Sequence, residues 1–444
     1  MLMPPSTPAP ERPGAPPEPS RLAWLDLLRG VAAMVVALHH ATYYYTPQWR
    51  GQMVDWFDPG RYGVLVFFLV SGYIVPASLE RHGRLRNFWI SRAFRIYPLL
   101  LLACTVYVLP FLFGVRGLRA GLEQYDPVIA VLAHLTMLQD VLAVPNAINV
   151  LWTLSYEMAF YLLVAALFAT GMHRRSAPIA VLLVVAAVLA GGLLPMTLLS
   201  RTMGTGPVVV TTAVVFAAAI AAAVSGRPVL RVAGCVLGAT LATALVLVNG
   251  RVGPWEGLTI LAVMFTGTAL YRAERHQIAR STAVLTAAAV LAGAIAAGVW
   301  NAHSSMAAAQ AQGFGLYWSG SIVLAAMTFA VGWALRHRAI PGWLTGLGTM
   351  SFSIYLLHSV LLMLFDQFFG MPDHDDPLRL LLFVLVLLAV SWAAHRFIEA
   401  PAQRLGRRLV RRRPPLAPST PATPPPTHSS AAGHATKSSS APGP

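Results

Sequence analysis

The sequence predicts an all-α, polytopic integral membrane protein with about 10–12 transmembrane helices and both termini in the cytoplasm. Of its 444 residues, 56% are hydrophobic and only 11% are charged, and the mean hydropathy is +0.62. A soluble domain is about one quarter charged. So much apolar surface therefore requires the bilayer as a solvent, and the spacing of the apolar segments and the placement of the arginines support the same class.

Apolar segments recur along the chain at lengths that suit membrane helices. A helix needs about 20 predominantly apolar residues to cross a hydrocarbon core of about 30 Å. Such segments occur at residues 22–45, 61–79, 94–114, 150–170, 177–194, 207–224, 229–248, 255–271, 282–300, 316–335, 347–369 and 379–398. A weaker stretch, 127–142, is predicted to be a re-entrant or interfacial helix.

The arginines predict the orientation of these spans, because cytoplasmic loops carry an excess of Lys and Arg. With the N-terminus inside, the inner loops hold Arg81, Arg84, Arg86, Arg92, Arg95, Arg174, Arg175, Arg227, Arg272, Arg275, Arg280, Arg336, Arg338 and the cluster at 404–413. The outer loops hold Arg50, Arg116, Arg119, Arg201 and Arg251. The net charge of +15 thus reflects orientation in a cell membrane, and we expect no nucleic-acid partner.

The two ends of the chain are polar and rich in proline. Residues 1–20 and 411–444 have too little apolar surface to form a core, so both are predicted to be disordered tails. They flank one membrane domain at residues 21–410. Cys104 and Cys235 both lie in apolar segments, so we expect neither a disulfide framework nor a metal site.

The first span carries ionisable side chains, each of which needs a partner or a function inside a membrane. Asp26 and Arg29 are three positions apart and can pair on one helix face. Arg29 and His40 are eleven positions apart, which on an ideal helix places them within about 20° of one face, whereas His39 lies about 80° away. This spacing predicts a stripe with a guanidinium in the inner part and an imidazole near the outer end. The alternative is that His40 only reaches the outer interface beside Tyr43.

Glu157 lies in the span at 150–170, at about the predicted depth of His40. A carboxylate beside an imidazole would orient it and favour its charged form. We therefore predict a contact between Glu157 and His40. The alternative is a solvated glutamate near a helix start, where the helix dipole favours it.

Three further patterns contain polar candidates. Arg92 and Arg95 share a helix face at the cytoplasmic surface, which suits a polyphosphate or is simply positive-inside charge. The small residues Ser71 and Gly72 allow a helix or a ligand to approach closely. In the penultimate span, the helical offsets of Ser351, Tyr355 and His358 form one stripe, although a lone buried histidine is usually only hydrogen-bonded. Near the inner interface, Arg396 and Glu399 are predicted to pair.

Six segments, in this order along the chain, resemble the membrane acyltransferase 3 family. They are LDLLRGVAAMVVALHH, GVLVFFLVSGYIV, SRAFRIYPLLLLA, LWTLSYEMAFYLL, LGTMSFSIYLLHSV and RFIEAPAQRLGRRL. The family's arginine-ten residues-histidine pattern falls on Arg29 and His40, and its arginine pair falls on Arg92 and Arg95. The sequence departs from the family at Leu65, Met158 and Leu357, where members often have an acid, a second acid and a tryptophan.

The resemblance implies transfer of an acyl group, most often acetyl, from acyl-CoA to a hydroxyl of a sugar, surface glycan or glycosylated small molecule. On this basis we interpret His40 as the general base and Glu157 as the residue that orients it. Arg29, Arg92 and Arg95 would bind the donor, and Arg29 and His40 would line one continuous cavity. Further candidates for the substrate cavity are Ser71, Tyr97, Trp152, Ser155, Tyr355 and His358.

Two other classes of function fit the composition. A transporter or flippase for a glycan or lipid-linked substrate would also need buried charges, but the paired broken helices typical of such proteins are not evident. A sensory or scaffolding membrane protein would instead act through its two tails.

Overall fold

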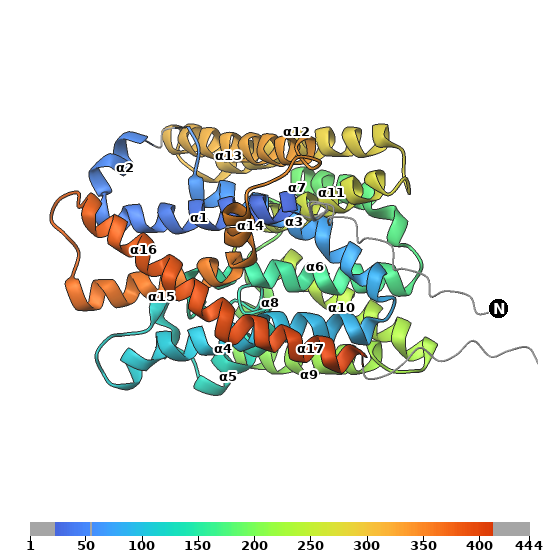
Figure 1. Ribbon diagram of the computed structural model, residues 1–444. Coiled ribbons are helices and arrows are strands. Elements are labelled where there is room, and N and C mark those ends of the chain that lie inside the picture. Colours follow the sequence, from blue (N-terminus) through green and yellow to red (C-terminus); the bar gives the residue numbers. More distant parts are fainter. Residues whose placement is uncertain (1–22, 54–55, 412–444) are drawn as a thin grey trace, which may run out of the picture.

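The computed structural model describes residues 23–53 and 56–411, and every regular element in these ranges is helical (Figure 1). The α-helices are α1 (Ala23–Tyr45), α2 (Pro47–Met53), α3 (Pro59–His82), α4 (Leu85–Leu112), α5 (Pro127–Thr136), α6 (Trp152–Ala169), α7 (Ser176–Ala190), α8 (Leu198–Met203), α9 (Thr205–Ala223), α10 (Pro228–Val248), α11 (Pro254–Glu274), α12 (Arg280–Ser305), α13 (Ala308–Ala334), α14 (Gly342–Thr349), α15 (Ser351–Phe369), α16 (Pro377–Ala394) and α17 (Ala400–Arg411). Shorter 3₁₀ or π segments are η1 (Arg119–Gln124), η2 (Asn149–Leu151), η3 (His173–Arg175) and η4 (His395–Glu399).

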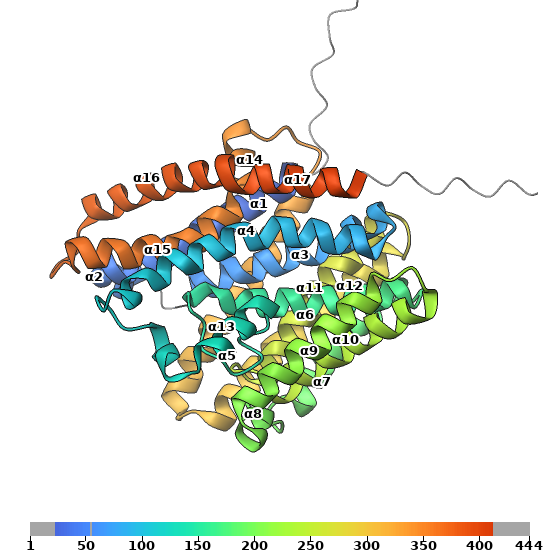
Figure 2. The same ribbon diagram turned by 90° about the horizontal axis from the view of Figure 1, so that it is seen from below.

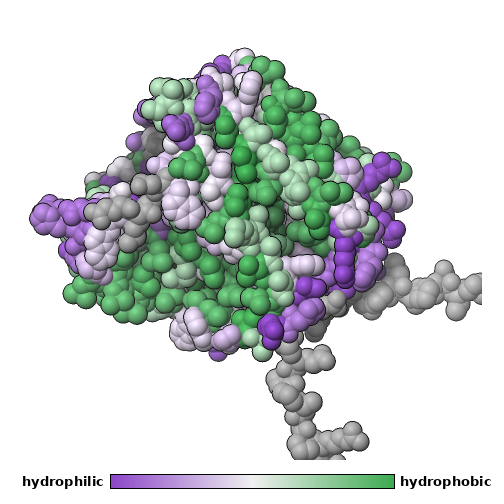
Figure 3. All heavy atoms as spheres, turned by 90° about the horizontal axis from the view of Figure 1, so that it is seen from above, coloured by the Kyte–Doolittle hydropathy of each residue, from purple (hydrophilic) through white to green (hydrophobic). Residues whose placement is uncertain are grey.

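The long helices run alongside one another as a bundle (Figures 1 and 2). Within the described residues, nine helices are long and apolar enough to cross a membrane. They include α3, α4, α6, α9, α10, α12, α13, α15 and the continuous α16–α17. Figure 3 shows a face that is mostly hydrophobic along its middle, with hydrophilic residues mainly near its two ends. The prediction of an all-α polytopic membrane protein is confirmed.

The remaining three predicted spans are also helical. α7 has only 15 residues. α1 contains the charged residues Asp26 and Arg29, which form an ion pair at 3.8 Å as predicted. α11 is buried along almost its whole length and packs against α3, α7 and α12. α11 is therefore the central helix of the bundle and is shielded from lipid by its neighbours. The two predicted tails lie outside the described residues, except that Arg411 is the last residue of α17.

α3 and α11 approach so closely that their backbones touch through glycine. A Cβ atom on Gly72 would overlap the carbonyl oxygen of Met264, and one on Gly267 would overlap that of Leu69. The hydroxyl of Thr268 donates to the Gly72 carbonyl at 2.8 Å. Gly72 is therefore a helix-packing residue, as small residues at membrane helix interfaces usually are.

The weaker apolar stretch at 127–142 contains α5 and the beginning of a buried loop, so it is helical only in its first half. The Asp126 carboxylate caps α5, and after α5 the chain turns at Met137 with φ 55°. In the loop, Asn146 donates to Asp140 at 2.9 Å and accepts from Gln139 at 3.1 Å. Non-helical backbone at membrane depth needs such internal partners.

The π segment η4 joins α16 to α17 and changes the environment of Glu399. Glu399 is buried, and its carboxylate accepts hydrogen bonds from Ser353 at 2.8 Å and His395 at 3.1 Å. The predicted pairing of Arg396 with Glu399 is therefore wrong. The wider π turn rotates Glu399 towards α15 rather than leaving it at the interface.

The α3–α11 contact yields a stability prediction. Gly72→Ala should lower the free energy of unfolding by about 1–3 kcal/mol, because the added methyl group forces two backbones apart. Gly346→Ala is the matched control, since a Cβ atom there meets nothing within 4 Å and Ala favours the helix of α14. Thermal unfolding in detergent would measure both, and equal melting temperatures for the two variants would contradict the close contact.

Candidate functional site

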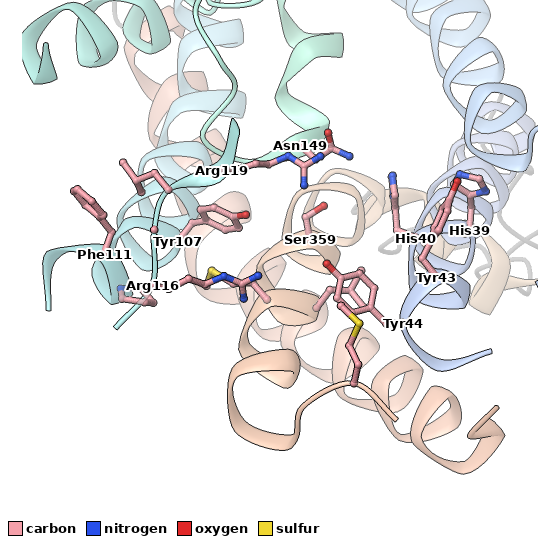
Figure 4. Close-up of a pocket in the computed structure, with 16 residues that line it drawn as sticks. His39, His40, Tyr43, Tyr44, Tyr107, Phe111, Arg116, Arg119, Asn149 and Ser359 are labelled. Carbon is pink, nitrogen blue, oxygen red and sulfur yellow. The ribbon is translucent and has the colours of Figure 1, made fainter. Parts of the chain in front are cut away.

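Two cavities are lined by several of the ionisable residues that the sequence singles out, namely His40 in one and Arg29, Arg95 and Glu157 in the other. The larger, called here the His40 cavity, has a volume of about 550 Å³ (Figure 4). It is lined by His39, His40, Tyr43, Tyr44, Tyr107, Pro110, Phe111, Arg116, Gly117, Leu118, Arg119, Asn149, Ser359, Leu362, Met363 and Met371. The smaller, the Arg29 cavity, has a volume of about 70 Å³. It is lined by Arg29, Val64, Phe67, Phe68, Ser71, Arg95, Ile96, Thr153, Leu154, Glu157, Tyr161, Ser351, Phe352 and Tyr355.

His40 forms a pair with His358 of α15. The Nδ1 atom of His40 lies 3.0 Å from Nε2 of His358, and the two rings stack with their centroids 5.1 Å apart. His358 is completely buried, whereas His40 also faces the larger cavity. The predicted buried histidine of the penultimate span is thus a direct partner of the predicted base.

The hydrogen bonds around His358 determine where both imidazoles carry their protons. Nδ1 of His358 lies 3.2 Å from the carbonyl oxygen of Ile354, which can only accept, so Nδ1 carries the proton. Nε2 of His358 is then an acceptor, and both His40 Nδ1 at 3.0 Å and the Ser359 hydroxyl at 3.2 Å can donate to it. With His40 donating from Nδ1–H, its other ring nitrogen, Nε2, is left with an unprotonated lone pair.

His39 lies beside His40 with the two ring centroids 5.3 Å apart, but it has a different partner. Its Nε2 atom lies 3.6 Å from the Asp58 carboxylate, which also caps the start of α3. The two neighbouring histidines therefore differ as the helix geometry predicts. His40 faces α15, while His39 is turned towards the start of α3.

Sequence reasoning missed most of the His40 cavity. Arg116 and Arg119 come from the connection after α4, and Tyr107 comes from α4 itself. In Figure 4 these side chains and that of Ser359 surround the same space as His40. In the sequence, Arg116 and Arg119 indicate only loop charges that set the orientation of the spans. Nothing in their spacing indicates that the connection after α4 folds back over the end of α1.

The Arg29 cavity brings together residues from five helices, α1, α3, α4, α6 and α15. Arg29 of α1, Arg95 of α4, Ser71 of α3 and Glu157 of α6 all line it. The Glu157 carboxylate accepts from Ser71 at 3.4 Å and from the hydroxyl of Tyr161. The predicted contact between Glu157 and His40 is therefore wrong, because Glu157 lies with the arginines and the partner of His40 is His358.

A packed layer separates the two cavities, which share no lining residue. The ring of Tyr355 lies 6.0 Å from that of His358 on one side and 5.3 Å from that of Phe67 on the other. The Tyr355 hydroxyl lies 2.9 Å from that of Thr153. The expected continuous cavity between Arg29 and His40 is thus interrupted at Tyr355.

The other predicted site residues support the structure around the cavities. Tyr97 donates to the Leu135 carbonyl at 2.6 Å and so holds α5 against α4. Ser155 accepts from the backbone N–H of Asp140 at 3.1 Å, and Trp152 packs edge-on against neighbouring aromatic rings. Arg92 is buried with its guanidinium over the rings of Phe88 and Tyr161, and only its neighbour Arg95 lines a cavity. Within the described residues, no three His, Cys, Asp or Glu side chains gather to hold a metal ion.

Comparison with known proteins gives one family and several relatives. The profile of the acyltransferase domain matches residues 22–396, which is most of the chain. The chain is 26% identical over 152 residues to the peptidoglycan O-acetyltransferase OatA of Listeria monocytogenes, covering 31% of this chain and 23% of the relative. It is 30% identical over 147 residues to the O-acetyl transferase of Shigella phage Sf6, covering 31% and 43%. It is 27% identical over 184 residues to YrhL of Bacillus subtilis, covering 37% and 27%.

The chain therefore spans less than half of the length of each of these relatives. No solved structure matches it significantly.

The separation of the cavities can be tested with a matched pair of cysteine variants. Ser359→Cys places a thiol in the His40 cavity and Ser71→Cys places one in the Arg29 cavity, in a background with Cys104 and Cys235 replaced by serine. With the predicted orientation, a bulky membrane-impermeant maleimide applied from outside should label position 359 and leave position 71 unlabelled. The extent of labelling at each position is measured in vesicles of both orientations. Equal labelling of both positions from outside would contradict the packed layer.

Proposed function

Because the chain belongs to the acyltransferase domain family, we propose that it is an O-acyltransferase of the cell membrane. It transfers an acyl group, most often acetyl, from acyl-CoA to a hydroxyl group of a saccharide or glycoside. The relatives named O-acetyltransferase support the reaction type. The single observation that carries the chemistry is the pairing of His40 with His358, because it leaves an unprotonated ring nitrogen of His40 beside a cavity.

His40 is the general base in this proposal. Its Nε2 atom takes the proton of the acceptor hydroxyl as the hydroxyl oxygen forms a bond to the acyl carbonyl carbon. The bond between that carbon and the thioester sulfur then breaks, and the proton passes from His40 to the departing thiolate. An imidazole suits both transfers because its ordinary pKa lies near the operating pH. His358 keeps the proton of His40 on Nδ1 and so is a positioning residue.

The dimensions of the His40 cavity suit a saccharide acceptor. A volume of about 550 Å³ lies in the range of small-molecule sites. Tyr44, Tyr107 and Phe111 supply aromatic surface on which the apolar face of a sugar ring can pack, and Asn149 and Ser359 supply hydrogen-bonding groups. This mixture of aromatic and polar side chains supports a glycoside rather than a lipid as the acceptor.

The Arg29 cavity supports a role in donor binding. Arg29 and Arg95 lie close enough for their charges to act on each other, and Glu157 is the one carboxylate that lines this cavity in the described part of the chain. Two guanidinium groups that converge in this way suit the phosphates of acyl-CoA. The acyl end of the donor would then have to pass Tyr355 to reach His40, so the packed layer must open during the reaction.

The base can be tested directly. His40→Ala should lower the rate of acyl transfer by about 10²–10⁴-fold, which is the usual contribution of a general base, and should leave acyl-CoA affinity nearly unchanged. The measurement is the incorporation of labelled acetyl from acetyl-CoA into extracted glycoside products of native membranes. His303→Ala, which changes an exposed histidine at the end of α12, is the control. Full activity of the His40 variant would overturn the assignment.

The donor site makes a separate prediction. Arg95→Gln should raise the Kd for acetyl-CoA by roughly 10-fold or more, because a hydrogen bond to a charged group contributes about 1.5–3 kcal/mol. Arg86→Gln is the matched control, since Arg86 lies near the start of α4 and lines neither cavity. Isothermal titration of the protein in nanodiscs with acetyl-CoA measures both, and equal affinities would exclude phosphate binding in the Arg29 cavity.

A further inference from the structure

The His40 cavity is electropositive in a way that the proposed reaction does not require. Its charged lining residues in the described part of the chain are Arg116 and Arg119, with His39 and His40 opposite, and no carboxylate lines it. General-base catalysis on a neutral sugar hydroxyl needs none of this positive charge. The charge therefore indicates something further about the molecule that the cavity accepts.

The two arginines differ in what neutralises them. Arg116 donates to the Asp366 carboxylate at 3.0 Å, so its charge is already paired. The side chain of Arg119, at the start of η1, forms no ion pair or hydrogen bond with any described residue. Its side chain points into the cavity beside Asn149, across from His40 (Figure 4). A planar guanidinium with five N–H donors is thus free to bind a ligand there.

We propose that the acceptor is an anionic saccharide, with a carboxylate or phosphate group close to the hydroxyl that is acylated, and that Arg119 binds this group. The inference rests on the proposed function and adds the substrate class. Arg119 faces the carboxylate or phosphate with its guanidinium fork, a geometry that both groups match in a bidentate manner. The aromatic residues of the cavity would hold the sugar ring between Arg119 and His40.

An anionic acceptor would also offset part of the positive charge around the base. Arg119 lies close enough to His40 for its charge to act on the imidazole. A nearby cation disfavours the positive charge that His40 acquires when it takes the proton of the hydroxyl. A carboxylate or phosphate bound to Arg119 would neutralise that cation before the proton moves. The acceptor would therefore offset the positive charge of Arg119 near His40 as well as supplying the hydroxyl.

The test uses the full-length protein in membranes of the cells that produce it, so that the natural acceptor is present. Labelled acetyl-CoA is added, and extracted water-soluble and lipid-linked products are separated by anion exchange at neutral pH. The expected result is that the label is retained and elutes with salt. Blocking carboxylates with methylamine and a carbodiimide then distinguishes the sources, because a carboxylate product loses its retention and a phosphate product keeps it.

Variants at position 119 connect the retained product to the arginine. Arg119→Gln should lower kcat/KM for the purified acceptor roughly 10- to 100-fold by loss of a charged hydrogen-bond donor, with donor affinity unchanged. Arg119→Lys should restore part of the loss, because it keeps the charge without the fork. Arg201→Gln, an exposed arginine of α8 outside the cavity, is the control.

The outcomes separate the two levels of the proposal. Label in a neutral product, or equal kcat/KM for wild type and Arg119→Gln, would overturn the anionic acceptor and leave the acyltransferase reaction standing. The absence of any label above the background of His40→Ala would overturn the proposed function, and the inference with it. Label in an anionic product that depends on Arg119 supports both.

Discussion

The hydrogen bond between His40 and His358 is the interaction on which the proposed chemistry of this membrane domain depends. It joins α1 to α15, which are separated by most of the chain, and it does so between two groups that lipid cannot solvate. Because the Ile354 carbonyl can only accept, the protonation of His358 follows from the backbone of α15, and that of His40 follows from His358. The Ile354 carbonyl thus determines, through His358, which nitrogen of the His40 imidazole is left unprotonated.

The same constraint explains why several motif residues support the site without entering it. In a bilayer each buried polar group needs an internal partner, and an unmet one costs several kcal/mol. Ser155 accepts from the backbone of the buried loop, Asn249 bonds to that loop at the Val141 carbonyl, and Asn146 bonds to Asp140. These bonds hold the chain between α5 and α6 in place. Asn149, at the end of that stretch, is thereby positioned in the lining of the His40 cavity.

The fold could be predicted from the sequence because hydropathy and helix length decide it almost alone in a membrane. All twelve predicted spans are helices, and the choice of His40 over His39 rests on the rotation of an ideal helix. The partner of His40 could not be predicted in the same way. Depth along α6 places Glu157 by axial distance only, and which helices are neighbours depends on packing between distant segments.

The residues that line the two cavities could also be predicted only in part from the sequence. Arg29 could be selected as a cation inside a span, and Arg92 and Arg95 as a pair on one helix face, but Arg92 is instead covered by Phe88 and Tyr161. The position of Arg119 in a cavity could not be predicted from the sequence. A loop arginine has the same effect on the orientation of the membrane spans wherever its side chain points. Only the folding of the connection after α4 over the end of α1 brings Arg119 into the lining of the same cavity as His40.

Tyr355 sets the remaining physical requirement on the reaction. Its ring lies between the two cavities, and its hydroxyl lies 2.9 Å from that of Thr153 and 3.2 Å from the Val150 carbonyl. Hydrogen bonds of this kind contribute about 0.5–1.5 kcal/mol each, so the layer stays closed when no donor is bound. In the proposed reaction, the binding energy of the donor would offset the loss of these bonds when the layer opens. In the proposed reaction, a closed layer would keep the thioester apart from a base in a cavity that water can enter, and so would limit hydrolysis of the donor. The separation of the arginines from the imidazole is then compatible with transfer between them, because binding of the donor can supply the energy that displaces Tyr355.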